Sequence, residues 1–128
     1  MLYLDSSALV TLVVREPESE ALRCFLRSDP VRVSCGLART EVLQSVRPLG
    51  PAAVERARRM LRALDLILLD ESLLDAAGML EPAGLRSLDA IHLAAAGLLA
   101  PGLDAIITYD RCMADAAAAL GLPVAAPA

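Results

Sequence analysis

Short aliphatic runs alternate with longer segments of helical pattern along this chain, and this alternation limits the folds open to it. The runs are almost continuously apolar, which is typical of strands buried on both faces of a parallel sheet. Strands that alternate with helices imply right-handed crossovers and a sheet covered by helices on both sides. We therefore predict an α/β fold, a three-layer α/β/α sandwich around a central, mostly parallel sheet of about four to five strands. The predicted strands are residues 1–5, 31–35, 66–70, 104–110 and 122–125, and the predicted helices are residues 7–14, 17–28, 37–47, 51–64, 72–80, 87–99 and 111–120.

The length of 128 residues fits a single domain, residues 1–128, that can bury a core of its own. Hydrophobic residues make up 56% of the chain and aromatic residues only 2%, so the core is expected to be aliphatic. The longest uncharged stretch, between Asp89 and Asp104, is interrupted by Pro101 and Gly102 and is too short to span a membrane. Without a basic region near Met1, the N-terminus does not resemble a signal peptide. We expect a cytoplasmic protein that binds no membrane.

The basic residues and cysteines exclude several mechanisms. All twelve basic residues are Arg, which rules out a P-loop lysine, a Schiff base and a Ser-Lys dyad. The single histidine, His92, rules out acid–base catalysis by two histidines. Cys24, Cys35 and Cys112 form no metal-binding spacing and are odd in number, so we expect unpaired thiols and no zinc site.

Four acidic residues stand at positions where chemistry could be placed. Asp5 and Asp110 each follow a predicted strand directly, Asp89 lies near the start of a predicted helix, and Glu41 flanks an apolar helical stripe. Each also has an ordinary interpretation. Asp110 is a good helix N-cap, Asp89 suits the positive end of a helix that Ser87 could cap, and Glu41 could be a solvated surface residue. For Asp5 the capping interpretation is weaker, because Ser6 and Ser7 are better placed to cap.

Taken together, the four acids suggest a metal site. In open parallel sheets the functional crevice lies at the carboxyl ends of the strands. If the first and fourth strands are neighbours, Asp5 and Asp110 meet there, and the helices can add Glu41 and Asp89. Carboxylates gathered in one crevice repel one another unless cations lie between them. Oxygen ligands of this kind suit Mg²⁺, with Mn²⁺ as an alternative, and Ser6, Ser7 and Thr108 are nearby hydroxyls that could hold the carboxylates in place.

The segments MLYLDSSALV, ARTEV, LRSLDAIHLAAA and ITYDRCMADAAAALGL resemble the four acidic motifs of PIN-domain nucleases. Their order and the size of the chain are similar to the VapC-type toxins of toxin–antitoxin modules, and the resemblance covers essentially the whole chain. It implies a PIN-like fold and a Mg²⁺-dependent endoribonuclease that cuts structured RNA, of the tRNA or rRNA class, with a metal-activated water. It also implies Asp5, Glu41, Asp89 and Asp110 as the catalytic metal ligands, Ser6 and Thr108 as their support, and an antitoxin protein as partner.

Other residues have two interpretations each. Arg86 and Arg111 stand beside motif acids and could contact RNA phosphates, although surface ion pairing is equally compatible with their positions. The group Arg56, Arg58, Arg59 and Arg62 fits a solvated helix face. We interpret His92 as a structural residue or a neighbour of a ligand, since hard cations prefer oxygen. The apolar helices, including the one with Leu22 and Leu26, are candidates for a homodimer interface or an antitoxin groove.

The sequence is also compatible with other functions. One is a PIN-like module that binds RNA or protein without a toxin role, and another is a housekeeping PIN nuclease. A phosphatase with an Asp nucleophile fits less well, because Ser7 stands where such enzymes place a second Asp and the chain has no Lys.

Overall fold

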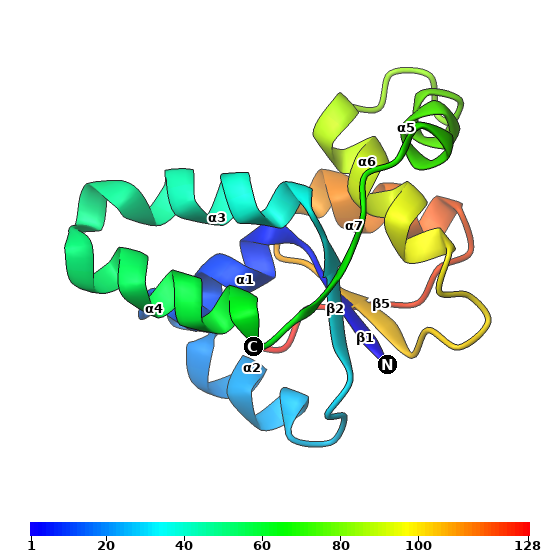
Figure 1. Cartoon of the computed structure of the whole chain (residues 1–128). Helices are drawn as coiled ribbons and strands as arrows, with labels where there is room; N and C mark the ends of the chain where they lie inside the picture. Colours follow the sequence, from blue (N-terminus) through cyan, green and yellow to red (C-terminus); the bar gives the residue numbers. More distant parts are fainter.

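The computed structural model describes residues 1–128 and has a central sheet of five parallel strands (Figure 1). The strands are β1 (Leu2–Leu4), β2 (Arg32–Cys35), β3 (Asp65–Ile67), β4 (Ala105–Ile107) and β5 (Val124–Ala125). Their order across the sheet is β3-β2-β1-β4-β5, and every pair is parallel. The predicted α/β fold with a parallel sheet is confirmed.

Helices cover both faces of the sheet and complete the three layers (Figure 1). The helices are α1 (Ser6–Val13), α2 (Ser19–Leu26), α3 (Leu37–Val46), α4 (Pro51–Arg62), α5 (Glu71–Gly78), α6 (Ser87–Gly97) and α7 (Arg111–Ala119), with a 3₁₀ turn η1 (Arg47–Leu49) between α3 and α4. The first four helices pack on one face and enclose one apolar cluster, while α5, α6 and α7 enclose a second cluster on the other face.

The order of the strands creates a switch point between β1 and β4. From β1 the chain moves to β2 and β3 on one side, and β4 and β5 then form on the other side. In β1 and β4, Tyr3 is paired with Ile106 and Leu4 with Ile107. The backbone N–H of Asp5 then donates to the carbonyl oxygen of Ile107 at 3.2 Å. The expected neighbourhood of the first and fourth strands is confirmed, and such switch points are where open α/β sheets bind ligands.

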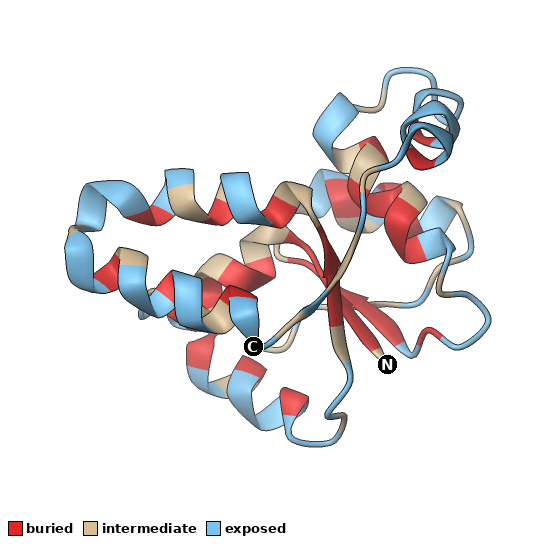
Figure 2. Cartoon of the chain, in the orientation of Figure 1, coloured by how far each residue is buried: buried red, intermediate tan, exposed pale blue.

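The core is aliphatic, as the composition predicted. Buried positions alternate with exposed ones along the helices, and the three central strands β2, β1 and β4 are buried almost throughout (Figure 2). The edge strands β3 and β5 are only partly buried. Leu22 and Leu26 lie in this core with at most 1% of their surface exposed. Both residues pack α2 against this chain's own sheet and helices, so they are not themselves available to a partner.

Several element boundaries differ from the sequence-based prediction. The strand predicted at residues 66–70 begins at Asp65 and ends at Ile67, because Asp70 instead caps α5 by accepting a hydrogen bond from the N–H of Leu73 at 2.8 Å. The second helix begins at Ser19 rather than Pro17, which lies in the preceding turn. Ser19 takes part in that turn, since its hydroxyl donates to the carbonyl oxygen of Thr11 at 2.7 Å.

Two predicted caps are wrong. The N-cap of α6 is Arg86, whose side chain makes no capping hydrogen bond, and Ser87 is already helical. Asp5 itself caps α1, whereas the sequence favours Ser6 and Ser7 for this role. Asp89 does lie in the first turn of α6, as expected. The three cysteines are free, and no helix is both long enough and apolar enough to cross a membrane.

Candidate active site

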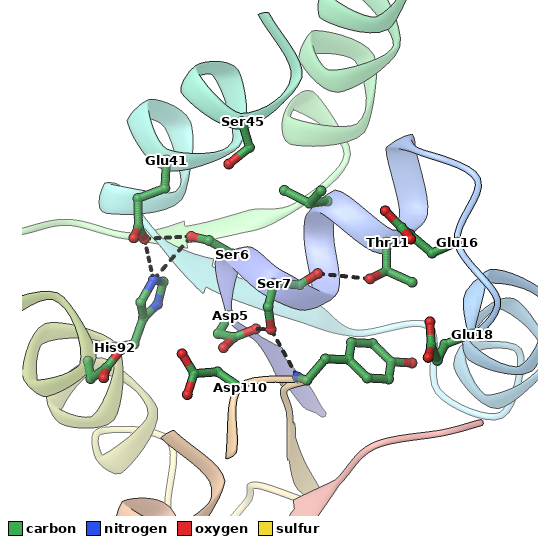
Figure 3. Close-up of a pocket in the computed structure, with 13 residues that line it drawn as sticks. Asp5, Ser6, Ser7, Thr11, Glu16, Glu18, Glu41, Ser45, His92 and Asp110 are labelled. Atoms are coloured by element: carbon green, nitrogen blue, oxygen red, sulfur yellow. Dashed lines mark hydrogen bonds and ion pairs between the residues drawn. The ribbon is translucent and has the colours of Figure 1, made fainter. Parts of the chain in front are cut away.

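A cavity of about 500 Å³ opens at the carboxyl ends of β1 and β4 (Figure 3). All four predicted acids line it, although they come from four different parts of the chain. Asp5 follows β1, Glu41 belongs to α3, Asp89 to α6, and Asp110 follows β4. Two further acids, Glu16 and Glu18 from the segment between α1 and α2, line the same cavity. The cavity is thus strongly negative for a chain of this size.

Asp5 is the most deeply buried of these acids, with 4% of its surface exposed. One carboxylate oxygen accepts from the Ser7 hydroxyl at 2.6 Å and from the N–H of Ala8 at 3.0 Å. The other accepts from the Thr108 hydroxyl at 2.5 Å. Burial raises the pKa of Asp5, while these hydrogen bonds act in the opposite direction. A buried carboxylate of this kind gains from a cation placed beside it.

Thr108 connects the two strand-end acids. Its hydroxyl donates to Asp5 and accepts from the backbone N–H of Asp110 at 3.1 Å. Replacing Thr108 by Val leaves a similar volume but removes both contacts. We expect Thr108→Val to lower the free energy of unfolding by about 1–3 kcal/mol, the range for a buried polar group left without its partner. Denaturant titration of the two proteins measures this loss, and an unchanged midpoint would contradict the role given to Thr108.

Glu41 is held by two side chains from other elements (Figure 3). The Ser6 hydroxyl donates to its carboxylate at 2.5 Å, and the ring Nε2 of His92 lies 2.7 Å from the same oxygen. The other ring nitrogen, Nδ1, lies 2.8 Å from the hydroxyl of Tyr3 in β1. Burial raises the pKa of Glu41, but the contacts with His92 and Ser6 outweigh it, so the pKa of this carboxyl lies below its usual range.

His92 is 3% exposed and makes contacts on both sides of its ring. Burial alone would lower the pKa of His92. The hydrogen bonds and charges of Cys35 and Glu41 act more strongly and raise its pKa from 6.5 to about 10. An imidazolium at neutral pH donates through Nε2 to Glu41 and so fixes the direction of that carboxylate. The expectation that His92 lies beside the predicted ligands agrees with this geometry.

Asp89 and Asp110 are joined by Arg86. The guanidinium Nη2 lies 2.8 Å from Asp89 and 2.9 Å from Asp110, and Nε donates to Asp89 at 2.9 Å. Asp110 also caps α7, because its second oxygen accepts from the N–H of Met113 at 3.1 Å. Burial raises the pKa of Asp110, but the Met113 amide and Arg86 bring it below its usual range.

The donor set fits a hard divalent cation, since the four acids offer only oxygen atoms. No three of the chain's acidic, histidine or cysteine side chains converge closely enough here to enclose an ion. Arg86 and His92 instead contact three of the four carboxylates, those of Asp89, Asp110 and Glu41. A positively charged guanidinium between two of the acids indicates that this position accommodates a cation.

Several contributors were not recognised in the sequence. Glu16 and Glu18 lie in a loop without a periodic pattern, and Tyr3 and Cys35 look like ordinary core residues of two strands. Arg111, in contrast, is exposed at the start of α7 and makes no ion pair. The arginines of α4 largely face solvent, with Arg62 lying 3.5 Å from Glu55 and Arg56 donating to the carbonyl oxygen of Val13.

Comparison with known proteins agrees with this geometry. The family described as PIN domain matches residues 2–119. A protein of Mycobacterium tuberculosis named Ribonuclease VapC46 is 52% identical over 126 residues, which cover 98% of this chain and 97% of that protein. The chain belongs to the VapC-type PIN-domain ribonucleases. Ribonuclease VapC47 of the same species is 39% identical over 132 residues, with 99% of this chain and 97% of that protein covered.

The fold of this VapC-type PIN domain also occurs in a solved structure. The crystal structure of Mycobacterium tuberculosis VapC20, described as a sarcin-ricin loop cleaving toxin, matches with a TM-score of 0.74. The two chains are 18% identical, and the match covers 99% of this chain and 100% of the other. At this identity the likeness concerns the fold, and the PIN-like three-layer architecture is confirmed by it.

Proposed function

We propose that this VapC-type PIN domain is a Mg²⁺-dependent endoribonuclease and the toxin of a toxin–antitoxin pair. Its substrate would be structured RNA of the tRNA or rRNA class, with Mn²⁺ as an alternative metal. The observation that carries the proposal is the meeting of four carboxylates, from four separate segments, in one cavity at the switch point of the sheet. The names of the relatives, which are ribonucleases, support it.

Asp5, Glu41, Asp89 and Asp110 would hold the cation. When bound, a divalent cation lowers the pKa of water near the phosphate and offsets the negative charge that develops there. Thr108 and Ser7 keep the Asp5 carboxylate directed, and Ser6 and His92 do the same for Glu41. These contacts come from buried or half-buried groups, so they are formed before substrate arrives. In this mechanism no side chain attacks the phosphate.

Binding the RNA requires positive charge outside the acidic cavity. Arg111 is exposed next to Asp110 and free of ion pairs, and Arg86 is exposed over 63% of its side chain. Both can approach phosphates bidentately. These two arginines are the proposed RNA contacts.

As a toxin, the protein would need an inhibitor, and the proposal includes a cognate antitoxin protein, a homodimer and a cytoplasmic location. Because acidic residues line the cavity, a basic antitoxin side chain placed among them would block the cation site. Co-expression of the neighbouring open reading frame, followed by a cleavage assay of the complex, tests this part. A complex that cleaves as well as the free protein would contradict it.

Removal of the metal is the direct test of the activity. We expect the protein to cut tRNA or ribosomal RNA in Mg²⁺ or Mn²⁺, and to lose this cleavage in EDTA and regain it when excess Mg²⁺ is added. Electrophoresis of labelled RNA measures the products. Cleavage that persists in EDTA would refute the metal-dependent mechanism, and intact RNA under all conditions would favour a binding module.

A further inference from the structure

Arg86 is the one arginine paired with the acids of the cavity. Its guanidinium contacts Asp89 and Asp110 at 2.8 and 2.9 Å, although these acids come from different elements. The cavity is lined by six acidic residues and by the buried His92, with uncharged residues between them. One exposed guanidinium therefore covers two of the acids of a strongly acidic cavity.

The contacts of Asp110 show what Arg86 blocks. One Asp110 oxygen caps α7 by accepting from Met113, and the other accepts from Arg86 at 2.9 Å. The Asp89 oxygen that meets Arg86 accepts a hydrogen bond from Nε and lies 2.8 Å from Nη2. A lone pair that accepts a guanidinium N–H is not available to a metal ion at the same time. A divalent cation can use these two oxygens fully only if Arg86 moves away.

Nothing in the local fold requires Arg86 to stay. Its side chain makes no capping hydrogen bond to α6 and is 63% exposed. An ion pair formed by so exposed an arginine contributes little to stability. Arg86 also borders two hollows, one with Glu41 and Leu88 and one on the outer side with Pro82 and Cys112. The guanidinium has room to turn outward.

We infer that Arg86 is an internal counter-ion that competes with the divalent cation for Asp89 and Asp110, and that it turns outward to contact an RNA phosphate when the cation binds. The inference rests on the proposed function, since it assumes that the carboxylates hold a metal. It gives Arg86 two opposed effects. Arg86 weakens binding of the metal alone and strengthens binding of RNA.

The first measurement is metal affinity without RNA. Electron paramagnetic resonance of the free ion measures how tightly each protein binds Mn²⁺. The proteins compared are the wild type, Arg86→Gln, Arg111→Gln and Arg62→Gln. We expect Arg86→Gln to bind Mn²⁺ about tenfold more tightly, the effect of removing two exposed ion pairs. Arg111→Gln removes a nearby charge that makes no ion pair and should change the affinity less. Arg62→Gln removes a distant charge and should leave it unchanged.

The second measurement is steady-state cleavage at saturating Mg²⁺. Arg86→Gln should raise KM for RNA about fivefold, the loss of one phosphate contact, with a smaller change in kcat. Arg62→Gln should match the wild type.

The outcomes separate the alternatives. Weaker or unchanged Mn²⁺ binding by Arg86→Gln would overturn the competition, because Arg86 would then be positioning the acids for the metal. Tighter Mn²⁺ binding with an unchanged KM would overturn the outward contact with RNA. If neither the wild type nor Arg86→Gln binds Mn²⁺, the proposed metal-dependent function fails. If both bind Mn²⁺ with equal affinity, only the competition by Arg86 fails.

Discussion

Asp5→Asn is expected to lower the rate of metal-dependent RNA cleavage by roughly a thousandfold or more while leaving the fold intact. The carboxylate of Asp5 is the acid most completely surrounded by donors, and it lies where β1 meets the cavity. Asn has the same shape but lacks the negative charge that would hold a cation. A single-turnover cleavage assay at saturating Mg²⁺ measures the loss.

The stability of Asp5→Asn should stay close to that of the wild type, and this separates a lost ligand from a lost fold. Asn can still accept from the N–H of Ala8, because Asn and Asp are comparable N-caps. Burial raises the pKa of Asp5, which means that the folded protein disfavours the charge there. The neutral amide removes this cost, but its nitrogen cannot accept from the Thr108 hydroxyl as the carboxylate does, so these two effects oppose each other. Thermal denaturation without metal should therefore give a midpoint close to that of the wild type.

Asp70→Asn is the matched control. Asp70 also caps a helix by accepting from the third N–H after it, in this case that of Leu73, but it is exposed and outside the cavity. We expect it to keep full cleavage activity. If Asp5→Asn retained cleavage within a few-fold of the control, the assignment of Asp5 as a metal ligand would be refuted.

The layers of the fold could be predicted because they depend on local patterns. Continuous apolar runs mark buried parallel strands, and the helical stripe of Ala38, Val42 and Val46 is buried as expected. The boundaries were less predictable because caps compete. At three helix starts the sequence is compatible with more than one N-cap or with a longer strand. The N-caps in the structure are Asp5, Asp70 and Arg86.

The meeting of the four acids at one edge of the sheet could be predicted from the topology. The side chains that contact these acids could not. Right-handed crossovers limit the possible strand orders, and in the order observed β1 pairs with β4, which brings Asp5 and Asp110 together. Side chains such as Tyr3, Cys35 and Glu16 reach the site from elements whose sequence shows only apolar strands or an irregular loop. The bridge formed by Arg86 depends on where its long side chain turns, and no spacing in the sequence determines that direction.

The second large effect concerns His92, whose replacement is expected to destabilise the protein in a pH-dependent way. His92→Gln breaks a buried contact with Glu41 at 2.7 Å and leaves the Tyr3 hydroxyl without its ring partner. We expect a loss of about 3 kcal/mol in the free energy of unfolding at pH 6, the lower end of the range for breaking a buried charged pair. Tyr3→Phe removes only the hydroxyl and should cost about 1 kcal/mol.

The sign of the pH dependence follows from the raised pKa of His92. Its pKa rises from 6.5 to about 10 in the folded protein, so folding favours the imidazolium. This stabilisation is fully present below pH 6.5 and is lost as the pH rises toward 10. The difference in unfolding free energy between the wild type and His92→Gln should therefore shrink across this interval, whereas the difference for Tyr3→Phe should change less. Urea titrations at several pH values, without divalent ions, measure both differences. Parallel curves for the wild type and His92→Gln would show that the imidazolium–Glu41 contact does not stabilise the fold.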